Sequence, residues 1–191
     1  MLPEEYNPGR QLPQHLRPPA PAEDKFLFNV RSASIEDLAE IAEIYNYYVT
    51  NSVVTFDETR KSRRVWVSKL TYSEKHSMPF IVAEAPSGQI LGYAMVTPWR
   101  QKRAFRFTVE LSIYLGPAAT QKGLGKVLLS ELIEQCRQNG IKEMIAVISD
   151  QGAEASMRLH QSLGFVEVGR MGRVGFKFNR WLGTVLLQKR L

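Results

Sequence analysis

Apolar and polar residues follow two rhythms along residues 26–191, one with the period of a strand and one with the period of a helix. Short apolar runs bounded by turn residues predict strands over 26–33, 79–85, 89–99, 105–115, 142–149, 165–171 and 184–191. Stretches with apolar residues three and four apart predict helices over 34–50, 63–70, 124–138 and 154–163. The order β-α-α-β-β-β-α-β-α-β-β favours an α/β fold in which helices cover a mixed sheet.

Several of these elements have residues at their ends that suit a boundary. Ser34 precedes the first helix and is expected to cap it. Gly140 and Gly164 follow two later helices, where glycine suits the left-handed backbone of a C-terminal cap. Ser87 and Gly88 separate two apolar strands and therefore predict a hairpin.

Residues 1–24 differ from the rest of the chain because they are rich in proline and almost lack aliphatic periodicity. Such a composition buries too little apolar surface to offset the entropy of ordering. We therefore expect a flexible extension over 1–24 and one domain over 25–191. With 191 residues, the chain is long enough to bury about two-thirds of its unfolded surface.

The composition is that of a globular protein, with 44% hydrophobic and 23% charged residues. No segment approaches the run of about 20 apolar residues that a membrane span needs. The N-terminus has no apolar core of a secretory signal, so we expect a cytoplasmic protein without a membrane partner. The single cysteine, Cys136, lies at helical spacing from Leu128 and Leu132, which favours core packing over a reactive thiol.

The net charge of +6 raises the question of a polyanionic partner. The one dense basic run, RKSRR at 60–64, lacks the interleaved aromatic residues of a surface that stacks nucleic-acid bases. A solvated helix face, or attraction of a small polyanion, explains the charge equally well. No motif supports nucleic-acid binding.

The segment PAATQKGLGKVLL (117–129) joins a predicted strand to a predicted helix and contains two glycines, Gly123 and Gly125. Glycine permits unusual backbone angles, and the first amides of a helix have no internal partner. Such a junction binds anions, and Lys122 and Lys126 add positive charge. A G-x-G pair by itself is more often a plain turn, and this one lacks the spacing of a dinucleotide fingerprint or a P-loop.

Further motifs settle that ambiguity. They are IYNYYVTNSVVTFDE (44–58), PWRQKRAFRFTVELSIYL (98–115), SMRLHQSLGF (156–165) and VGFKFNRWLGTVLLQKRL (174–191). Together with the glycine loop, they resemble, in order, the phosphinothricin acetyltransferase group of the GNAT (general control N-acetyltransferase-like) superfamily. The resemblance covers nearly all of residues 26–191. It implies a GNAT fold, with a twisted mixed sheet flanked by helices and a splayed strand pair at the acetyl-CoA site.

The resemblance also implies the chemistry, which is direct transfer of acetyl from acetyl-CoA to the amine of a small amino-acid-like acceptor. No metal is expected, because His15 falls in the predicted flexible extension and His76 in a polar loop, so neither is expected to form a cluster with His160. A homodimer is expected from the family alone. The residues that would contact acetyl-CoA are Ile113, Tyr114 and Leu115 at the strand end, and Gln121, Lys122, Gly123, Leu124, Gly125 and Lys126 at the pyrophosphate.

Two residues are candidates for catalysis. Glu110 matches the glutamate of the family motif TVE, which makes it the candidate general base; otherwise it is a carboxylate on the wet side of the sheet. His160 stands where relatives place a residue that protonates the departing thiolate; read alone, a histidine near a helix end is more often structural.

Other residues match the acceptor-binding segments of the family. These are Arg100, Gln101 and Lys102, then Glu110, Leu111 and Ser112, and the aromatic residue Phe56. Guanidinium groups suit paired hydrogen bonds to a carboxylate or phosphinate. For Phe56, ordinary core packing is an equal alternative.

Three positions depart from the family pattern. Thr120 replaces the arginine or glutamine that opens the pyrophosphate motif, Ala153 replaces an asparagine, and Gly183 replaces the aspartate of a WLD motif. Because the cradle consists mainly of amides, we expect acetyl-CoA binding to persist, either more weakly or with compensation by Lys122 and Lys126. The alternatives to the amino-acid acceptor are another small amine, a peptide N-terminus, or a non-catalytic acyl-CoA-binding module.

Overall fold

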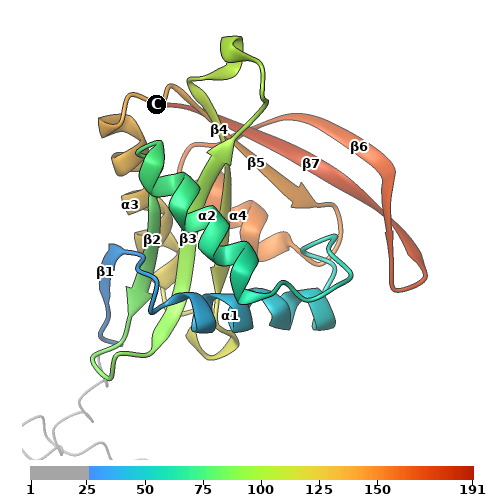
Figure 1. Ribbon diagram of the computed structural model, residues 1–191. Helices are drawn as coiled ribbons and strands as arrows, with labels where there is room; N and C mark the ends of the chain where they lie inside the picture. Colours follow the sequence, from blue (N-terminus) through green and yellow to red (C-terminus); the bar gives the residue numbers. More distant parts are fainter. Residues whose placement is uncertain (1–25) are drawn as a thin grey trace, which may run out of the picture.

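Seven strands form one sheet in the order β1-β2-β3-β4-β5-β7-β6 in the computed structural model, which describes residues 26–191 (Figure 1). The strands are β1 (Asn29–Ser32), β2 (Phe80–Glu84), β3 (Ile90–Pro98), β4 (Thr108–Leu115), β5 (Glu143–Ser149), β6 (Val166–Lys177) and β7 (Arg180–Arg190). Within the described residues, β4 and β5 are the one parallel pair of neighbours. The mixed sheet and the order of elements expected from the sequence are confirmed, while the extension expected over 1–24 lies outside the described residues.

Four α-helices cover the two faces of this sheet in the described residues (Figure 1). The helices are α1 (Leu38–Asn51), α2 (Arg63–Lys75), α3 (Leu124–Gln138) and α4 (Glu154–Ser162). One core joins α1 and α2 to the sheet, and a larger core joins α3 to the opposite face, with α4 packed against it. None of the helices in residues 26–191 is long and apolar enough to span a membrane.

The alternation of side chains along β4 decides which residues reach the α1/α2 face. Val109 and Leu111 are buried in the core under α3. Tyr114 packs against the core under α1 and α2. Because successive side chains of a strand point to opposite faces, Glu110 and Ser112 share the face of Tyr114, as the sequence predicts.

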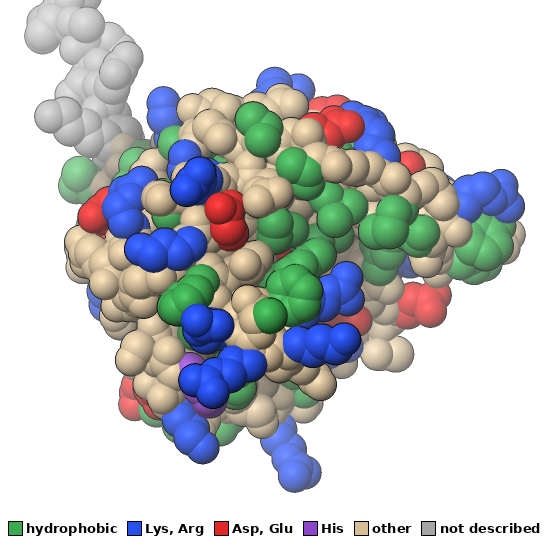
Figure 2. Space-filling view, turned by 90° about the horizontal axis from the view of Figure 1, so that it is seen from above, with side chains coloured by type: hydrophobic (Ala, Val, Ile, Leu, Met, Phe, Trp, Pro, Cys, Tyr) green, Lys and Arg blue, Asp and Glu red, His purple; other side chains and the backbone are tan. Residues whose placement is uncertain are grey.

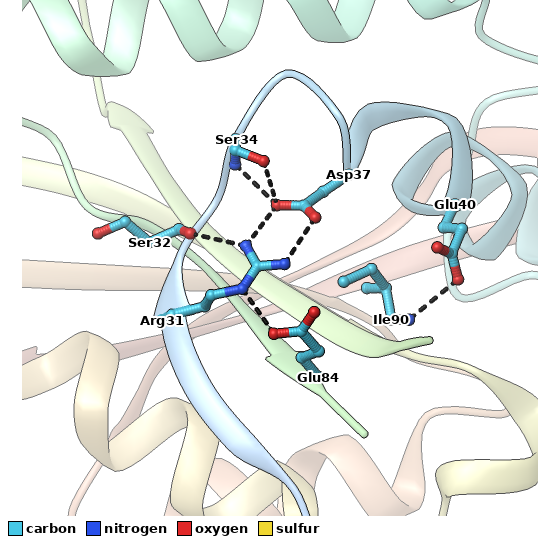
Figure 3. Close-up of polar contacts among 7 residues, drawn as sticks. All are labelled: Arg31, Ser32, Ser34, Asp37, Glu40, Glu84 and Ile90. Atoms are coloured by element: carbon cyan, nitrogen blue, oxygen red, sulfur yellow. Dashed lines mark hydrogen bonds and ion pairs between the residues drawn. The ribbon is translucent and has the colours of Figure 1, made fainter. Parts of the chain in front are cut away.

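The first helix begins at Leu38, three residues later than a helix capped by Ser34 would begin, because Asp37 organises the preceding turn (Figure 3). The Ser34 amide donates to the Asp37 carboxylate at 2.7 Å, so Ser34 is held by the turn and does not cap the helix. Arg31 of β1 donates to both oxygens of Asp37 at 2.7 and 2.8 Å and to Glu84 of β2 at 2.8 Å. Burial raises the pKa of Asp37, but the hydrogen bonds from Arg31 and Ser34 outweigh it and hold that pKa below its usual range.

The last two strands are much longer than the sequence predicts. The prediction ended one strand at 171 and began the next at 184, whereas β6 and β7 run on to a tight hairpin at 178–179. Their pairing shifts register between Met171 and Gly175. Gly172 and Gly175 belong to this irregular stretch, which interrupts the alternation of apolar and polar residues by which a strand is recognised in a sequence.

The outer strand β6 has an inverted pattern of exposure. Lys177 is 1% exposed, while Phe176 and Phe178 on either side are half exposed. Val166, Val168 and Val174 are also more than 50% exposed. The hairpin extends away from the helices, and Figure 2 shows apolar side chains gathered along the part of the surface where it extends. An exposed apolar strip of this length is unusual for a monomer.

Cys136 is fully buried in the core beneath α3. Burial raises the pKa of its thiol to about 12, so the thiolate does not form at neutral pH. The prediction of a packing role over a reactive thiol is confirmed.

Candidate active site

The strands β4 and β5 separate along the length of β4. They pair only from Thr108 to Glu110, whereas β3 stays paired with β4 as far as Leu115. The second half of β4 therefore presents an edge whose outward amides and carbonyls have no strand partner on that side. This is the splayed strand pair expected from the sequence.

The loop after β4 supplies a second set of free backbone amides. A 3-10 turn at Pro117–Ala119 leads to Gly123, whose φ of 78° makes it the left-handed residue that starts α3. Within residues 26–191, no acceptor lies within hydrogen-bond range of the amides from Gln121 to Gly125. Free amides at the positive end of a helix dipole bind anions, so these residues fit a pyrophosphate.

The side chains around this cradle leave its amides accessible. A Cβ on Gly125 would lie 3.3 Å from Leu159 Cδ2, a tight contact that the leucine side chain would have to relieve by a small shift. The Thr120 hydroxyl donates to the carbonyl of Pro117 at 2.9 Å and so caps the turn instead of reaching outward. Lys122 and Lys126 are exposed, and the Lys122 ammonium lies 4.7 Å from the ring centroid of Phe26.

Glu110 is half-buried at the point where β4 leaves β5. Thr97 of β3 lies directly opposite it in the strand ladder. Burial raises the pKa of Glu110, and the positive charges of Arg100 and Lys69 oppose that rise. A carboxylate with a raised pKa is a stronger base than an exposed one, which suits proton removal from an ammonium group.

A cluster of tyrosines fixes the end of β4 against α1. The ring of Tyr114 lies 5.1 to 5.7 Å, centroid to centroid, from the rings of Tyr45, Tyr48 and Tyr93. The Tyr48 hydroxyl donates to the carbonyl of Leu115 at 2.7 Å. These contacts hold rigidly the strand end whose amides are free.

The residues assigned to the acceptor lie in different surroundings. Arg100, Gln101 and Lys102 are exposed in the β3–β4 loop, and the Arg100 guanidinium lies 4.7 Å from the ring centroid of Trp99. Ser112 is half-buried beside Glu110. The side chain of Leu111 is buried under α3, so a contact with an acceptor at Glu110 would involve only its backbone.

Phe56 belongs to a loop that β6 holds from the outside. Its ring lies against Gly175, where a Cβ would approach Phe56 Cε2 to 2.6 Å. Two residues further along β6, the buried Lys177 ammonium donates to the carbonyl of Thr55 at 2.8 Å. The loop is also anchored from within, since the Tyr45 hydroxyl donates to Asp57 at 2.6 Å.

His160 is 2% exposed, and its ring packs edge-on against Phe165. Nδ1 lies 2.8 Å from the carbonyl of Ser156, which can only accept, so Nδ1 carries the proton. Nε2 is buried and has no partner among the described residues. Burial lowers the pKa of His160 and the Ser156 carbonyl partly opposes this, so the ring favours its neutral form.

Two of the three departures from the family pattern have local explanations. Ala153 precedes α4 without a side-chain cap and is buried. Gly183 donates its amide to Asp150 at 2.8 Å, and a Cβ there would lie 2.5 Å from both Asp150 Oδ2 and the carbonyl of Met171. Close approach of these three segments therefore requires glycine at 183.

Comparison with known proteins identifies the family. Residues 30–186 match the model of the acetyltransferase (GNAT) domain. This chain belongs to the GNAT acetyltransferase family. It is 38% identical over 162 residues to phosphinothricin N-acetyltransferase of Alcaligenes faecalis, covering 85% of this chain and 82% of the relative. It is 39% identical over 165 residues to the L-methionine sulfoximine/L-methionine sulfone acetyltransferase of Salmonella typhimurium, and this alignment covers 85% of this chain and 94% of that relative.

A solved structure gives the same result in three dimensions. The GNAT superfamily phosphinothricin acetyltransferase of Sinorhizobium meliloti, in complex with acetyl-CoA, aligns with a TM-score of 0.82 and 42% identity. The alignment covers 86% of this chain and 88% of that one. The predictions of a GNAT fold and of an acetyl-CoA-dependent N-acetyltransferase are confirmed. In the described residues, His, Cys, Asp and Glu form no group that could hold a metal ion.

Sequence reasoning missed several residues of this GNAT site. Lys177 was not singled out, because a lysine between two phenylalanines looks like the polar position of a strand. The helical spacing of Tyr45 and Tyr48 indicates only that they share a helix face, whereas the structure shows that their hydroxyls make the anchoring hydrogen bonds. Lys69 lay at the end of a predicted helix that continues to Lys75, so its position beside the site was not visible.

Proposed function

We propose that this protein transfers the acetyl group of acetyl-CoA to the α-amine of a small amino-acid-like acceptor by direct attack in a ternary complex. One arrangement carries the proposal: the half-buried Glu110 stands where the unpaired edge of β4 begins, and the free amides of Gln121 to Gly125 belong to the loop and helix start that follow the end of that edge. Both relatives named above are acetyltransferases of such acceptors by name. Acetyl-CoA supplies the activated acyl group as a thioester.

The donor side would be held mainly by the backbone. The amides of Gln121 to Gly125 would bind the pyrophosphate, with the Lys122 and Lys126 side chains adding charge, while the Lys126 amide donates to the carbonyl of Gly123 at 3.1 Å. On the open edge of β4, the amides of Ile113 and Leu115 would face the acetyl carbonyl and the pantetheine arm, whereas the amide of Tyr114 between them points to Tyr93 of β3. Donors placed before the reaction stabilise the oxyanion that develops as the amine attacks.

Glu110 would act as the general base, directly or through a water molecule. The active form is the carboxylate, which takes one proton from the acceptor ammonium and frees the lone pair of its nitrogen. Because burial raises the pKa of Glu110, we expect turnover to rise with pH through a pKa above 4.5. Arg100, Gln101, Lys102, Ser112 and Phe56 are the proposed surroundings of the acceptor.

His160 is the proposed source of the proton for the departing thiolate, and its hydrogen bond sets a condition on that role. With Nδ1–H held by Ser156, only the imidazolium has a proton to give from Nε2. Burial disfavours that form at neutral pH. We therefore expect His160→Gln to lower turnover at pH 7 less than Glu110→Gln does. An equal loss of turnover in the two variants would mean that His160 acts as the imidazolium in the wild-type enzyme.

The test is thiol release from acetyl-CoA with a panel of amines. The panel contains phosphinothricin, methionine sulfone, a peptide with a free N-terminus and a simple alkylamine. We expect turnover with the two amino acids and much less with the others. Turnover confined to the peptide or the alkylamine would contradict the acceptor, and acetyl-CoA binding without turnover of any amine would indicate a non-catalytic binding module.

We also propose a cytoplasmic homodimer in which the apolar strip of β6 contacts a second copy. The strip consists of Val166, Val168, Val174 and Phe176 of β6 and Phe178 of the following turn, each between 50% and 62% exposed. Sedimentation at decreasing concentration should show a dimer that Phe176→Glu converts to monomer. A wild-type monomer at micromolar concentration would contradict the dimer, and recovery of the protein from a membrane fraction would contradict the location.

A further inference from the structure

A cavity of about 330 Å³ lies between α2 and β3. Lys69, Tyr72 and Ser73 of α2 face Met95 and Thr97 of β3 across it. The volume is at the lower end of the range of about 300–1,000 Å³ that is usual for small-molecule sites. The cavity therefore suits a compact ligand of the size of an amino acid.

This cavity adjoins the candidate base. Thr97 lines it and lies directly opposite Glu110 in the ladder between β3 and β4. Opposed residues of an antiparallel pair point to the same face, with Cβ atoms about 4.5–5.5 Å apart. A small molecule whose amine reaches the Glu110 carboxylate can consequently extend into the cavity.

Lys69 is the one charged residue that lines the cavity. It is half-buried, and its ammonium lies 5.4 Å from the ring centroid of Trp66. None of the ion pairs within residues 26–191 includes Lys69. The neighbouring Asp57 is already paired with Lys61 at 2.9 Å. A partly desolvated ammonium without a close carboxylate is suited to binding an anion.

A second polar group in the same wall also lacks a partner. The Ser73 hydroxyl is buried and makes no hydrogen bond with any described residue. Buried hydroxyls are normally satisfied, so an orphaned one on a cavity wall points to a ligand. A carboxylate in the cavity would accept from Lys69, and it would accept from Ser73 once that buried hydroxyl turns toward the cavity.

We propose that this cavity is the acceptor subsite, in which Lys69 binds an anionic group of the acceptor while Glu110 takes the proton of its amine. The anionic group is the α-carboxylate or, in acceptors that have one, an acidic side chain. This inference rests on the proposed function. Burial lowers the pKa of Lys69 and the charges of Asp57 and Glu110 oppose that change, so a bound carboxylate reinforces the charged ammonium.

The test is a kinetic comparison of Lys69→Met with wild type for three acceptors: methionine sulfone, its α-amide, and phosphinothricin. We expect the KM of methionine sulfone to rise about tenfold or more, the usual result of losing a charge-assisted hydrogen bond. The KM of the α-amide, the KM of acetyl-CoA and kcat should change little. Lys69→Arg should restore part of the loss, and Ser73→Ala should cause a smaller rise in the same KM.

Lys75→Met is the matched control, since Lys75 lies on the same helix but is exposed and outside the cavity. If Lys69→Met raises the KM of phosphinothricin alone, the result would support anion binding by Lys69 and would identify the acidic side chain of the acceptor as the bound group. Equal rises for the acid and the amide, or no change for any acceptor, would overturn the inference while leaving the acetyltransferase active. A wild-type protein inactive toward all amino acids would overturn the proposed function, and this inference with it.

Discussion

The proposed donor and acceptor sides of this site are built in different ways. The donor side is one continuous segment, from the unpaired end of β4 to the first turn of α3, and it offers mainly backbone amides. The acceptor side is assembled from side chains on α2, β3, β4, the loop at 55–57 and β6. A backbone site depends on local conformation, whereas a side-chain site depends on how distant elements pack. Substitutions on the donor side should therefore change acetyl-CoA affinity alone, and substitutions on the acceptor side should change the acceptor KM or the rate of acetyl transfer alone.

The largest expected effect is that of Glu110→Gln on the acceptor side. Loss of a general base typically lowers the rate by about 10²–10⁴-fold. The dissociation constant of acetyl-CoA should stay within about twofold, because no donor-side amide moves. Single-turnover kinetics with calorimetry of acetyl-CoA binding measure both quantities, and an unchanged rate would remove Glu110 as the base.

The same variant carries its own folding control. The folded pKa of Glu110 lies above its unfolded value, so the contribution of this group to stability is present below about 4.5 and lost as pH rises through the folded pKa. Glutamine cannot ionise, so Glu110→Gln should be at least as stable as wild type at pH 7. Thermal unfolding measures this, and a lower melting temperature would show that the rate loss reflects damage to the fold.

The second effect tests whether β6 positions the acceptor loop. In Gly175→Ala the new Cβ would lie 2.6 Å from Phe56 Cε2, so the ring must move. Overpacking of this kind costs about 1–3 kcal/mol of stability. We expect a lower melting temperature and a higher KM for the acceptor, with acetyl-CoA binding unchanged. Gly172→Ala on the same strand is the control, since nothing lies within 4 Å of its Cβ; equal behaviour of the two variants would contradict this account.

A third variant, Gly123→Ala, acts on the donor side alone. Gly123 has a φ of 78° and open space around its Cβ, so alanine adds backbone strain without a clash. The left-handed conformation costs an L-residue about 1–2 kcal/mol. Acetyl-CoA affinity should fall severalfold with an unchanged acceptor KM. Gly88→Ala has a similar φ of 88° in the distant β2–β3 turn, and it should lose stability without losing acetyl-CoA affinity.

The smallest effect is expected for Gln121→Gly. Gln121 has a φ of 62°, a conformation that glycine adopts without penalty. Relief of this strain should raise the free energy of unfolding by up to about 1 kcal/mol, partly offset by the extra freedom of glycine when unfolded. Acetyl-CoA affinity should not fall, because the amide is retained; a marked loss in calorimetry would show that the Gln121 side chain contributes to the cradle.

The same contrast explains what could be predicted from the sequence. The boundaries of α3, the left-handed glycines and the alternation that exposes Glu110 all follow from short-range geometry, and the structure has them as predicted. The late start of α1 could not be predicted, because it depends on Arg31 of β1 meeting Asp37 and Glu84. No local pattern reveals such a contact between segments 53 residues apart.

The β6 strand shows the limit most clearly. Its alternation places Phe176 and Phe178 outside and Lys177 inside, the reverse of what hydrophobicity suggests. The burial of Lys177 is explained by a tertiary contact, because its ammonium donates a hydrogen bond to the carbonyl of Thr55 at 2.8 Å. The same holds for the proposed role of Lys69, which depends on its position across the cavity from Thr97, the neighbour of Glu110 in the strand ladder.

The unpaired amides from Gln121 to Gly125 have a consequence for how such an enzyme can diversify. Every residue except proline carries an amide, so most point mutations near this loop leave the grip on the acyl donor intact. Related enzymes can then change the side chains that determine specificity for the amine while acetyl-CoA binding is retained. On the proposed binding mode, an unusual residue such as Thr120 would be tolerated for the same reason, and directed evolution toward new amines should begin at α2 and β6.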